Sequence, residues 1–144
     1  MELQVGDQHL RVDPALLRNR PGVRAYLDRP VAVGIRPEDM QDASLAPAGG
    51  AVLYGAVDLV EALGSELLVH LRVAVPGVVT EDTRELARDA GLDPVEPVGT
   101  AGPLTELVAR FSPRSRVRKG ELVEVAVDTA RLHVFDLDTG RSIP

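Results

Sequence analysis

The sequence predicts a mainly β fold, in the form of a small antiparallel barrel. Aromatic residues make up only 3% of the 144 residues and tryptophan is absent. The core must therefore come from Val, Leu, Ala and Ile, whose β-branched members favour strands. Several short segments alternate apolar and polar residues, and turn residues separate them. Many short strands with few helical segments are typical of small antiparallel barrels.

Length and composition predict that residues 1–144 form a single domain. A hydrophobic content of 44% is enough for one core and too little for two full-sized ones. Residues 1–30 form a predicted lead-in, with a small hairpin around Gly6 and a helix or loop over 14–26. Because apolar Leu3 and Val5 already read as a strand, we expect the chain to begin at a boundary inside a longer protein.

A short half-buried strand is predicted where Val31, Val33 and Ile35 alternate with smaller or polar residues. Pro37 ends it, because proline cannot continue the strand ladder, and a single turn is expected over 38–40. Residues 43–50 follow as a turn-rich linker.

The strongest local signal is a long hairpin over 52–73, with Gly64 and Ser65 in a tight turn that gives Gly64 a positive φ. One face of each strand is expected to be apolar. These faces comprise Leu53, Val57, Leu59 and Leu63 on the first strand, and Leu67, Val69, Leu71 and Val73 on the second.

Residues 76–103 are predicted to be a surface insertion, because prolines and glycines surround one short helical stretch at 81–90. Thr80 suits the N-cap of that helix and Gly91 its end. Strand patterns return at 104–111, 122–127 and 132–137. The fold class is thus an antiparallel barrel with a short helical insertion.

Charge and cysteine content narrow the function classes. The net charge of −6 gives no global attraction to nucleic acid or anionic lipid. The absence of cysteine removes disulfides and thiolate chemistry, which fits a reducing compartment such as the cytoplasm. No signal peptide or run of about 18 apolar residues is visible, so we expect any membrane link to pass through a partner.

The residues of enzyme active sites and metal sites are not arranged in recognisable motifs. The one lysine, Lys119, lies in Arg-Lys-Gly-Glu and cannot complete a phosphate-binding loop. His9, His70 and His133 have no second histidine at a metal-ligand spacing, and each is expected to be a surface or half-buried strand histidine. No serine lies in a Gly-x-Ser-x-Gly elbow, and turn capping explains most acidic pairs. We therefore predict a fragment without enzymatic activity, catalytic residues, bound cofactor or metal.

A basic stretch at 110–119 carries five positive charges and is the local feature that would suit nucleic acid. Nucleic-acid-binding barrels add stacking aromatics, and Phe111, the only nearby candidate, fits a core position better. We therefore read the stretch as a solvated loop.

Three segments in order resemble the C-terminal regulatory region of sugar-type ABC importer ATPases, the family of the maltose and glycerol-phosphate importer subunits. The first is Val-Gly-Ile-Arg-Pro-Glu-Asp at 33–39. The second is the Val-Asp-Leu-Val-Glu-Ala-Leu-Gly-Ser-Glu hairpin at 57–66. The third runs over 117–140 and includes Gly-Glu-Leu-Val at 120–123 and Arg-Leu-His-Val-Phe-Asp-Leu-Asp-Thr-Gly at 131–140.

The resemblance implies an oligonucleotide-binding-like (OB-like) barrel of the type called TOBE. It implies a regulatory and dimerisation module whose partners are the nucleotide-binding domain of the same polypeptide, a second ATPase subunit, the importer's membrane subunits indirectly and a regulatory protein. ATP and Mg would belong to the parent ATPase, located at the inner face of the cell membrane.

Eight residues of these motifs are candidates for structural anchoring or partner contact. Arg36 and Glu38 lead, because Pro37 fixes the turn and arginine offers a planar fork to a carboxylate. Glu61 and Glu66 are both candidate partners of Arg36. The full set is Gly34, Ile35, Arg36, Pro37, Glu38, Glu61, Gly64 and Glu66.

Two other functions remain open at this point. Related TOBE-type barrels bind molybdate or tungstate through backbone amides and Ser, Thr or Lys groups, so a free-standing oxyanion-binding protein is the alternative. Such proteins usually contain near-identical tandem halves, and no such repeat is visible here. A nucleic-acid-binding barrel would show affinity that falls steeply with salt.

Overall fold

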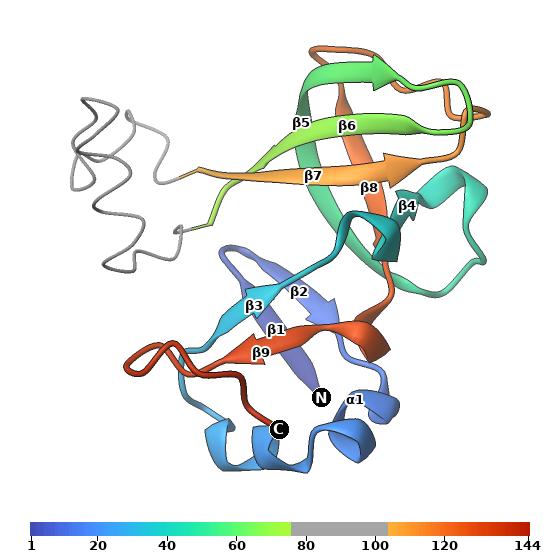
Figure 1. The fold of residues 1–144 in the computed structure, drawn as a ribbon. Coiled ribbons are helices and arrows are strands. Elements are labelled where there is room, and N and C mark those ends of the chain that lie inside the picture. The colour runs from blue at the N-terminus through green and yellow to red at the C-terminus, as the bar shows by residue number, and fades with distance from the viewer. Residues whose placement is uncertain (76–103) are drawn as a thin grey trace, which may run out of the picture.

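The computed structural model describes residues 1–75 and 104–144, and the described residues form three antiparallel sheets. The largest has five strands in the order β4-β8-β5-β6-β7 and curls into a half-open barrel, seen in the upper part of Figure 1. Its strands are β4 (Met40–Asp42), β5 (Ala51–Ala62), β6 (Leu67–Val73), β7 (Thr105–Phe111) and β8 (Leu122–Val127). The predicted mainly β, OB-like barrel is confirmed.

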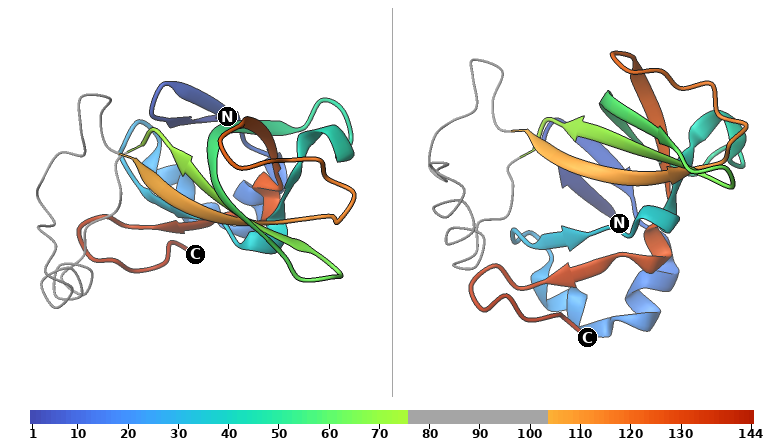
Figure 2. Two further views of the ribbon diagram at one scale, coloured as in Figure 1. Left: turned by 90° about the horizontal axis from the view of Figure 1, so that it is seen from above. Right: turned by 45° about the horizontal axis from the view of Figure 1, so that its top comes forward.

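The two outer strands of this sheet approach each other, so the barrel nearly closes. β4 lies against β7, and the two views of Figure 2 show the sheet curving around its own axis. Gln41 on β4 links the edges through its side-chain oxygen Oε1. That atom accepts hydrogen bonds from the backbone N–H groups of Asp42 (2.9 Å) and of Ser112, just after β7 (3.0 Å). Pairing the edges in this way protects backbone groups that an open sheet would expose.

A second layer lies below the barrel in Figure 1 and contains both ends of the chain. One ribbon pairs β3 (Ala32–Gly34) with β9 (His133–Phe135), and the other pairs β1 (Glu2–Val5) with β2 (Gln8–Arg11). The layer also contains α1 (Pro14–Asn19), the 3₁₀ turn η1 (Pro21–Tyr26) and the 3₁₀ turn η4 (Thr129–Arg131). The remaining 3₁₀ turns, η2 (Pro37–Asp39) and η3 (Ala43–Leu45), flank β4.

The helix α1 begins where its sequence predicts. Pro14 occupies the first turn, where its missing N–H is not needed. The side-chain oxygen Oδ1 of Asp13 accepts a hydrogen bond from the backbone N–H of Ala15 at 2.7 Å, which caps the free end.

One hydrophobic core joins the two layers. Leu10 and Leu16, from the predicted lead-in, belong to the same buried cluster as Leu71 and Phe111 of the barrel. Phe111 is only 1% exposed, so the prediction that it fills a core position is confirmed. The predicted lead-in at 1–30 therefore contributes side chains to this core.

The long hairpin is confirmed, but part of its predicted apolar face is wrong. Leu53 and Val57 are buried, whereas Leu59 is 44% exposed and Leu63 is 54% exposed. The register between β5 and β6 shifts between Val57 and Leu59, so an extra residue reverses the alternation beyond that point. The second strand and the positive φ of Gly64 (85°) agree with prediction.

The predicted insertion at 76–103, including its helix at 81–90, lies outside the described residues. Within the residues that are described, no helix is long and apolar enough to cross a membrane.

A buried carboxylate fastens the loop after β7 to the barrel. Asp42 accepts hydrogen bonds from the Oγ of Ser115 (2.5 Å), the Oγ of Ser44 (2.7 Å) and the backbone N–H of Ser44 (2.9 Å). Burial is the largest influence and raises the pKa of Asp42, but the bonds from Ser115 and Ser44 together outweigh it. The pKa of Asp42 therefore lies below its ordinary value of 3.8.

Replacing Ser115 by alanine is expected to destabilise the chain by about 1–2 kcal/mol at neutral pH, because a charged acceptor loses a donor. A depressed carboxylate pKa stabilises the fold above the unfolded pKa, and that stability is lost as the pH falls through the folded pKa. The difference in free energy of unfolding between wild type and S115A, measured by urea unfolding, should therefore shrink below about pH 4. A difference that stays constant down to about pH 2.5 would show that the ionised form of Asp42 is not the acceptor.

Candidate functional site

The segment at 33–39 forms a tight turn between the two layers, which we call the signature turn. Gly34 ends β3 opposite His133 of β9, and Ile35 packs against the core. Pro37 begins η2, and the backbone N–H of Asp39 donates to the carbonyl of Arg36 at 3.0 Å. Arg36 and Glu38 themselves are exposed. The backbone is thus fixed, while these two charged side chains face solvent.

Neither expected carboxylate partner of Arg36 is engaged with it. Glu61 pairs with His70 at 3.0 Å, and Glu66 pairs with the Nε of Arg110 at 3.1 Å. In the described ranges, Arg36 makes no ion pair. The expectation failed because each glutamate already has a basic neighbour on an adjacent strand of the sheet.

The carboxylate that does anchor the signature turn is Asp39, which the sequence motif contains but which we did not select. Its side chain is 3% exposed, and its Oδ1 lies 3.2 Å from the Nη1 of Arg131, which is ion-pair distance without the geometry of a hydrogen bond. Its carbonyl oxygen accepts from the backbone N–H of Asp128 at 2.9 Å. These contacts join the first and third resemblance motifs, far apart in the chain. Arg131, the first residue of the run at 131–140 in the third motif, was the signal in the sequence.

A second cluster that sequence reasoning missed lies on the outer face of the barrel. His70 on β6 lies between two carboxylates, with Glu61 Oε2 3.0 Å from its Nε2 and Glu106 Oε1 3.3 Å from its Nδ1. The prediction that His70 is a half-buried strand histidine is confirmed, and its pairing with two glutamates is a further finding. Sequence spacing could not reveal it, because the partners are cross-strand neighbours on β5 and β7.

The two glutamates raise the pKa of His70 above its usual 6.5, mainly through the hydrogen bond to Glu61 and secondly through that to Glu106, while burial opposes them. A raised histidine pKa stabilises the fold fully below the unfolded pKa, and this contribution is lost as the pH rises through the folded pKa.

We expect Glu61→Gln to lower the pKa of His70 more than Glu106→Gln does, because the bond to Glu61 is the stronger influence. An NMR titration of the His70 ring protons measures both shifts, with His9, 62% exposed, as internal reference. An unchanged pKa in E61Q would contradict the pairing.

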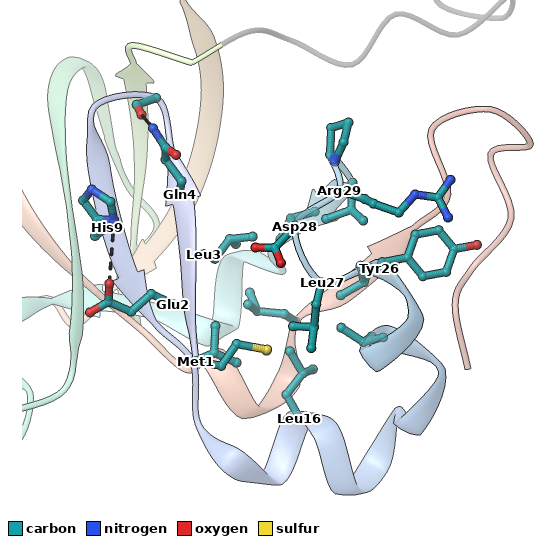
Figure 3. A pocket seen from close by; sticks show the side chains of 18 residues that line it. Met1, Glu2, Leu3, Gln4, His9, Leu16, Tyr26, Leu27, Asp28 and Arg29 are labelled. Carbon is teal, nitrogen blue, oxygen red and sulfur yellow. Dashed lines mark hydrogen bonds and ion pairs between the residues drawn. The ribbon is translucent and has the colours of Figure 1, made fainter.

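An open groove of about 740 Å³ lies between β1 and the segment at 26–33 (Figure 3). Its lining includes the buried apolar residues Leu16, Val23 and Val134. The exposed polar residues of its lining include Glu2, Gln4, Asp28 and Arg29. Asp28 has a positive φ of 62°. None of the eight candidate residues lines this groove.

A second depression, of about 590 Å³, includes Arg36 in its lining. It lies where the end of α1, the signature turn, η4 and the last residues of the chain meet. Arg20, Arg131 and His133 line it as well. We call these four side chains together the basic hollow. Of the eight candidates, the structure places only Arg36 there.

Metal ligands do not gather into a site in the residues described. No group of three His, Asp or Glu side chains in ranges 1–75 and 104–144 could hold a metal ion. The cluster of His70, Glu61 and Glu106 is instead a set of surface ion pairs.

Comparison with known proteins gives consistent relatives. Residues 33–101 match the model of the TOBE domain. The chain is 36% identical over 125 residues to the trehalose/maltose import ATP-binding protein MalK of Thermococcus litoralis, covering 85% of this chain and 26% of the relative. It is 36% identical over 128 residues to the trehalose import ATP-binding protein SugC of Mycobacterium tuberculosis, covering 85% of this chain and 31% of the relative.

A third relative broadens the range of named solutes. The chain is 29% identical over 142 residues to the osmoprotective compounds uptake ATP-binding protein GgtA of Synechocystis, covering 97% of this chain and 31% of the relative. The chain thus spans between a quarter and a third of the length of these curated relatives. It contains a TOBE domain and is related to the ATP-binding subunits of sugar ABC importers.

Proposed function

We propose that this chain is the regulatory and dimerisation domain of the ATPase subunit of an ABC importer for sugars or related solutes. The observation that carries the proposal is 36% identity, over 85% of this chain, to proteins named for trehalose and maltose import. ATP hydrolysis, with ATP and Mg, then belongs to a nucleotide-binding domain elsewhere in the same polypeptide. Lys119 lies outside any phosphate-binding loop.

The partners that follow are that nucleotide-binding domain, a second copy of the subunit, the membrane subunits through the assembled transporter and a regulatory protein. The parent would work at the cytoplasmic face of the membrane. The fold supports a docking role, because the signature turn presents charged side chains on a backbone that the core and Asp39 hold in place. Rigid elements that display such groups are suited to partner recognition.

The mass of the native polypeptide tests the proposal first. An antibody raised against residues 1–144 is used on source cells, and the captured protein is measured by intact mass and peptide sequencing. We expect a product more than twice this chain's 15.4 kDa, with a phosphate-binding loop among its peptides. A product of 15.4 kDa would overturn the proposal.

The dimerisation role needs a separate test. Sedimentation velocity without nucleotide compares the native polypeptide with a truncated form that lacks these 144 residues. We expect the native form to be dimeric and the truncated form to shift towards monomer. Equal self-association in the two forms would remove dimerisation from this domain.

A further inference from the structure

The basic hollow carries more positive charge than the groove beside β1. Three arginines and one histidine line it, and none of its lining residues is Asp or Glu. The chain as a whole has 22 acidic and 16 basic residues, so this lining runs against the overall balance. Like charges that lie close together repel, and a bound anion relieves that repulsion. Two carboxylates offset part of this charge: Asp39 pairs with Arg131, and Pro144, the last residue of the 144-residue chain, also lines the hollow.

Arg20 is held in position by three contacts. Its Nη1 donates to the Oγ of Ser142 at 3.2 Å and to the carbonyl of Ile143 at 3.0 Å. Its Nη2 lies 3.2 Å from the Nδ1 of His133. None of these partners is a carboxylate, so the positive charge of Arg20 is oriented but not neutralised.

The contact with Arg20 also determines the hydrogen-bonding state of His133. A guanidinium group only donates, so Nδ1 of His133 must accept and carry no proton. The proton of the neutral ring is then on Nε2. His133 therefore offers one further donor beside the arginines.

The other two arginines come from the two motifs that the ion pair of Asp39 joins. Arg131 is 58% exposed and shares its charge with Asp39 at 3.2 Å. Arg36 is exposed and has no ion-pair partner among residues 1–75 and 104–144. With Arg131 partly neutralised, the hollow retains the charge of Arg20 and of Arg36.

We propose that the basic hollow binds the phosphate group of a small phosphorylated metabolite. Guanidinium forks match phosphate oxygens in geometry and charge. Arg36 is exposed, and Arg20 keeps two of its five N–H donors after its three contacts. The volume of about 590 Å³ lies within the range of small-molecule sites, which leaves room for an organic part beyond the phosphate. The net charge of −6 disfavours a large polyanion, which would meet repulsion over the rest of the surface.

This inference does not depend on the chain belonging to a transporter. Such a ligand would contact both the signature turn and the segment that begins at Arg131, so its binding would stabilise the junction between the two layers. A ligand that binds only the folded chain raises the unfolding temperature, and the stabilisation grows with the logarithm of the ligand concentration divided by Kd.

Isothermal titration of the 144-residue chain with glucose 6-phosphate, inorganic phosphate and glucose tests the proposal. We expect saturable binding of glucose 6-phosphate, weaker binding of inorganic phosphate and none of glucose. Arg36→Gln should weaken the binding about tenfold, because one charge-assisted donor pair is lost. Arg36→Lys should weaken it less, because the charge stays while the fork is lost.

Arg114→Gln is the matched control, since Arg114 is an exposed arginine in the loop after β7. The affinity of R114Q for glucose 6-phosphate should stay within about twofold of the wild-type affinity. As a separate test, the affinity of the wild type should fall as sodium chloride is added. Equal affinity for inorganic phosphate and glucose 6-phosphate would identify the free ion as the ligand and keep the phosphate site. Absence of binding at millimolar concentration, or equal losses in R36Q and R114Q, would overturn the proposal.

Discussion

Replacing Phe111 by alanine is expected to lower the free energy of unfolding by about 3–5 kcal/mol, the usual cost of removing a buried phenylalanine ring. The ring is 1% exposed and belongs to the core cluster that joins the barrel to the second layer. Phe111 is the last residue of β7, and the backbone N–H of Ser112 beside it donates a hydrogen bond to Gln41. This bond restrains the backbone, so the neighbouring residues cannot move in to fill the cavity that the substitution leaves. Urea unfolding followed by circular dichroism measures the change.

Leu122→Ala is the control for that measurement. Leu122 lies on β8 of the same sheet but is 81% exposed, so its truncation should change stability by no more than about 0.5 kcal/mol. A loss below about 1 kcal/mol in F111A would mean that the ring does not lie in the shared core.

Gly6→Ala is expected to be the most damaging glycine substitution in the described part of the chain. Gly6 has a φ of 61°, and a Cβ there would meet the carbonyl oxygen of Ala74 far inside contact distance and the Cγ1 of Val75 at 3.1 Å. The left-handed backbone costs about 1–2 kcal/mol for an L-residue, and the overpacking adds about 1–3 kcal/mol. Thermal and urea unfolding both measure the sum.

Gly64→Ala separates these two contributions. Gly64 has a similar positive φ of 85°, but a Cβ there meets nothing within 4 Å. G64A should therefore show only the backbone cost of about 1–2 kcal/mol. Equal losses in the two variants would mean that the turn of the β1–β2 hairpin does not pack against the end of β6 as the structure has it.

Local patterns predicted most of the strands because the alternation of apolar residues is a property of neighbouring positions. Val69, Leu71 and Val73 alternate strictly and are all buried on β6. The bulge after Val57 was not predictable in this way, because Asp58 and Leu59 fit either register when taken alone. Only pairing with β6 decides which of them faces outward.

In the candidate site, too, the sequence predicted the local turn but not the contacts between distant segments. The motif at 33–39 located the turn that joins the two layers, and Pro37 fixed its position in the chain. The choice of ion-pair partners failed, because Glu61 and Glu66 have basic neighbours across the sheet. Asp39 lies beside Arg131 in the fold in which β3 pairs with β9.

The sequence by itself determined the fold class, the turn positions and the relationship to importer ATP-binding subunits, because composition, alternation and ordered motifs are local properties of the chain. The tertiary structure alone decided that residues 1–30 complete the core, that His70 lies between two glutamates, and that Arg20, Arg36 and Arg131 line one hollow. These are contacts between distant segments. Their partners are selected by strand pairing and shared burial, which no spacing along the chain encodes.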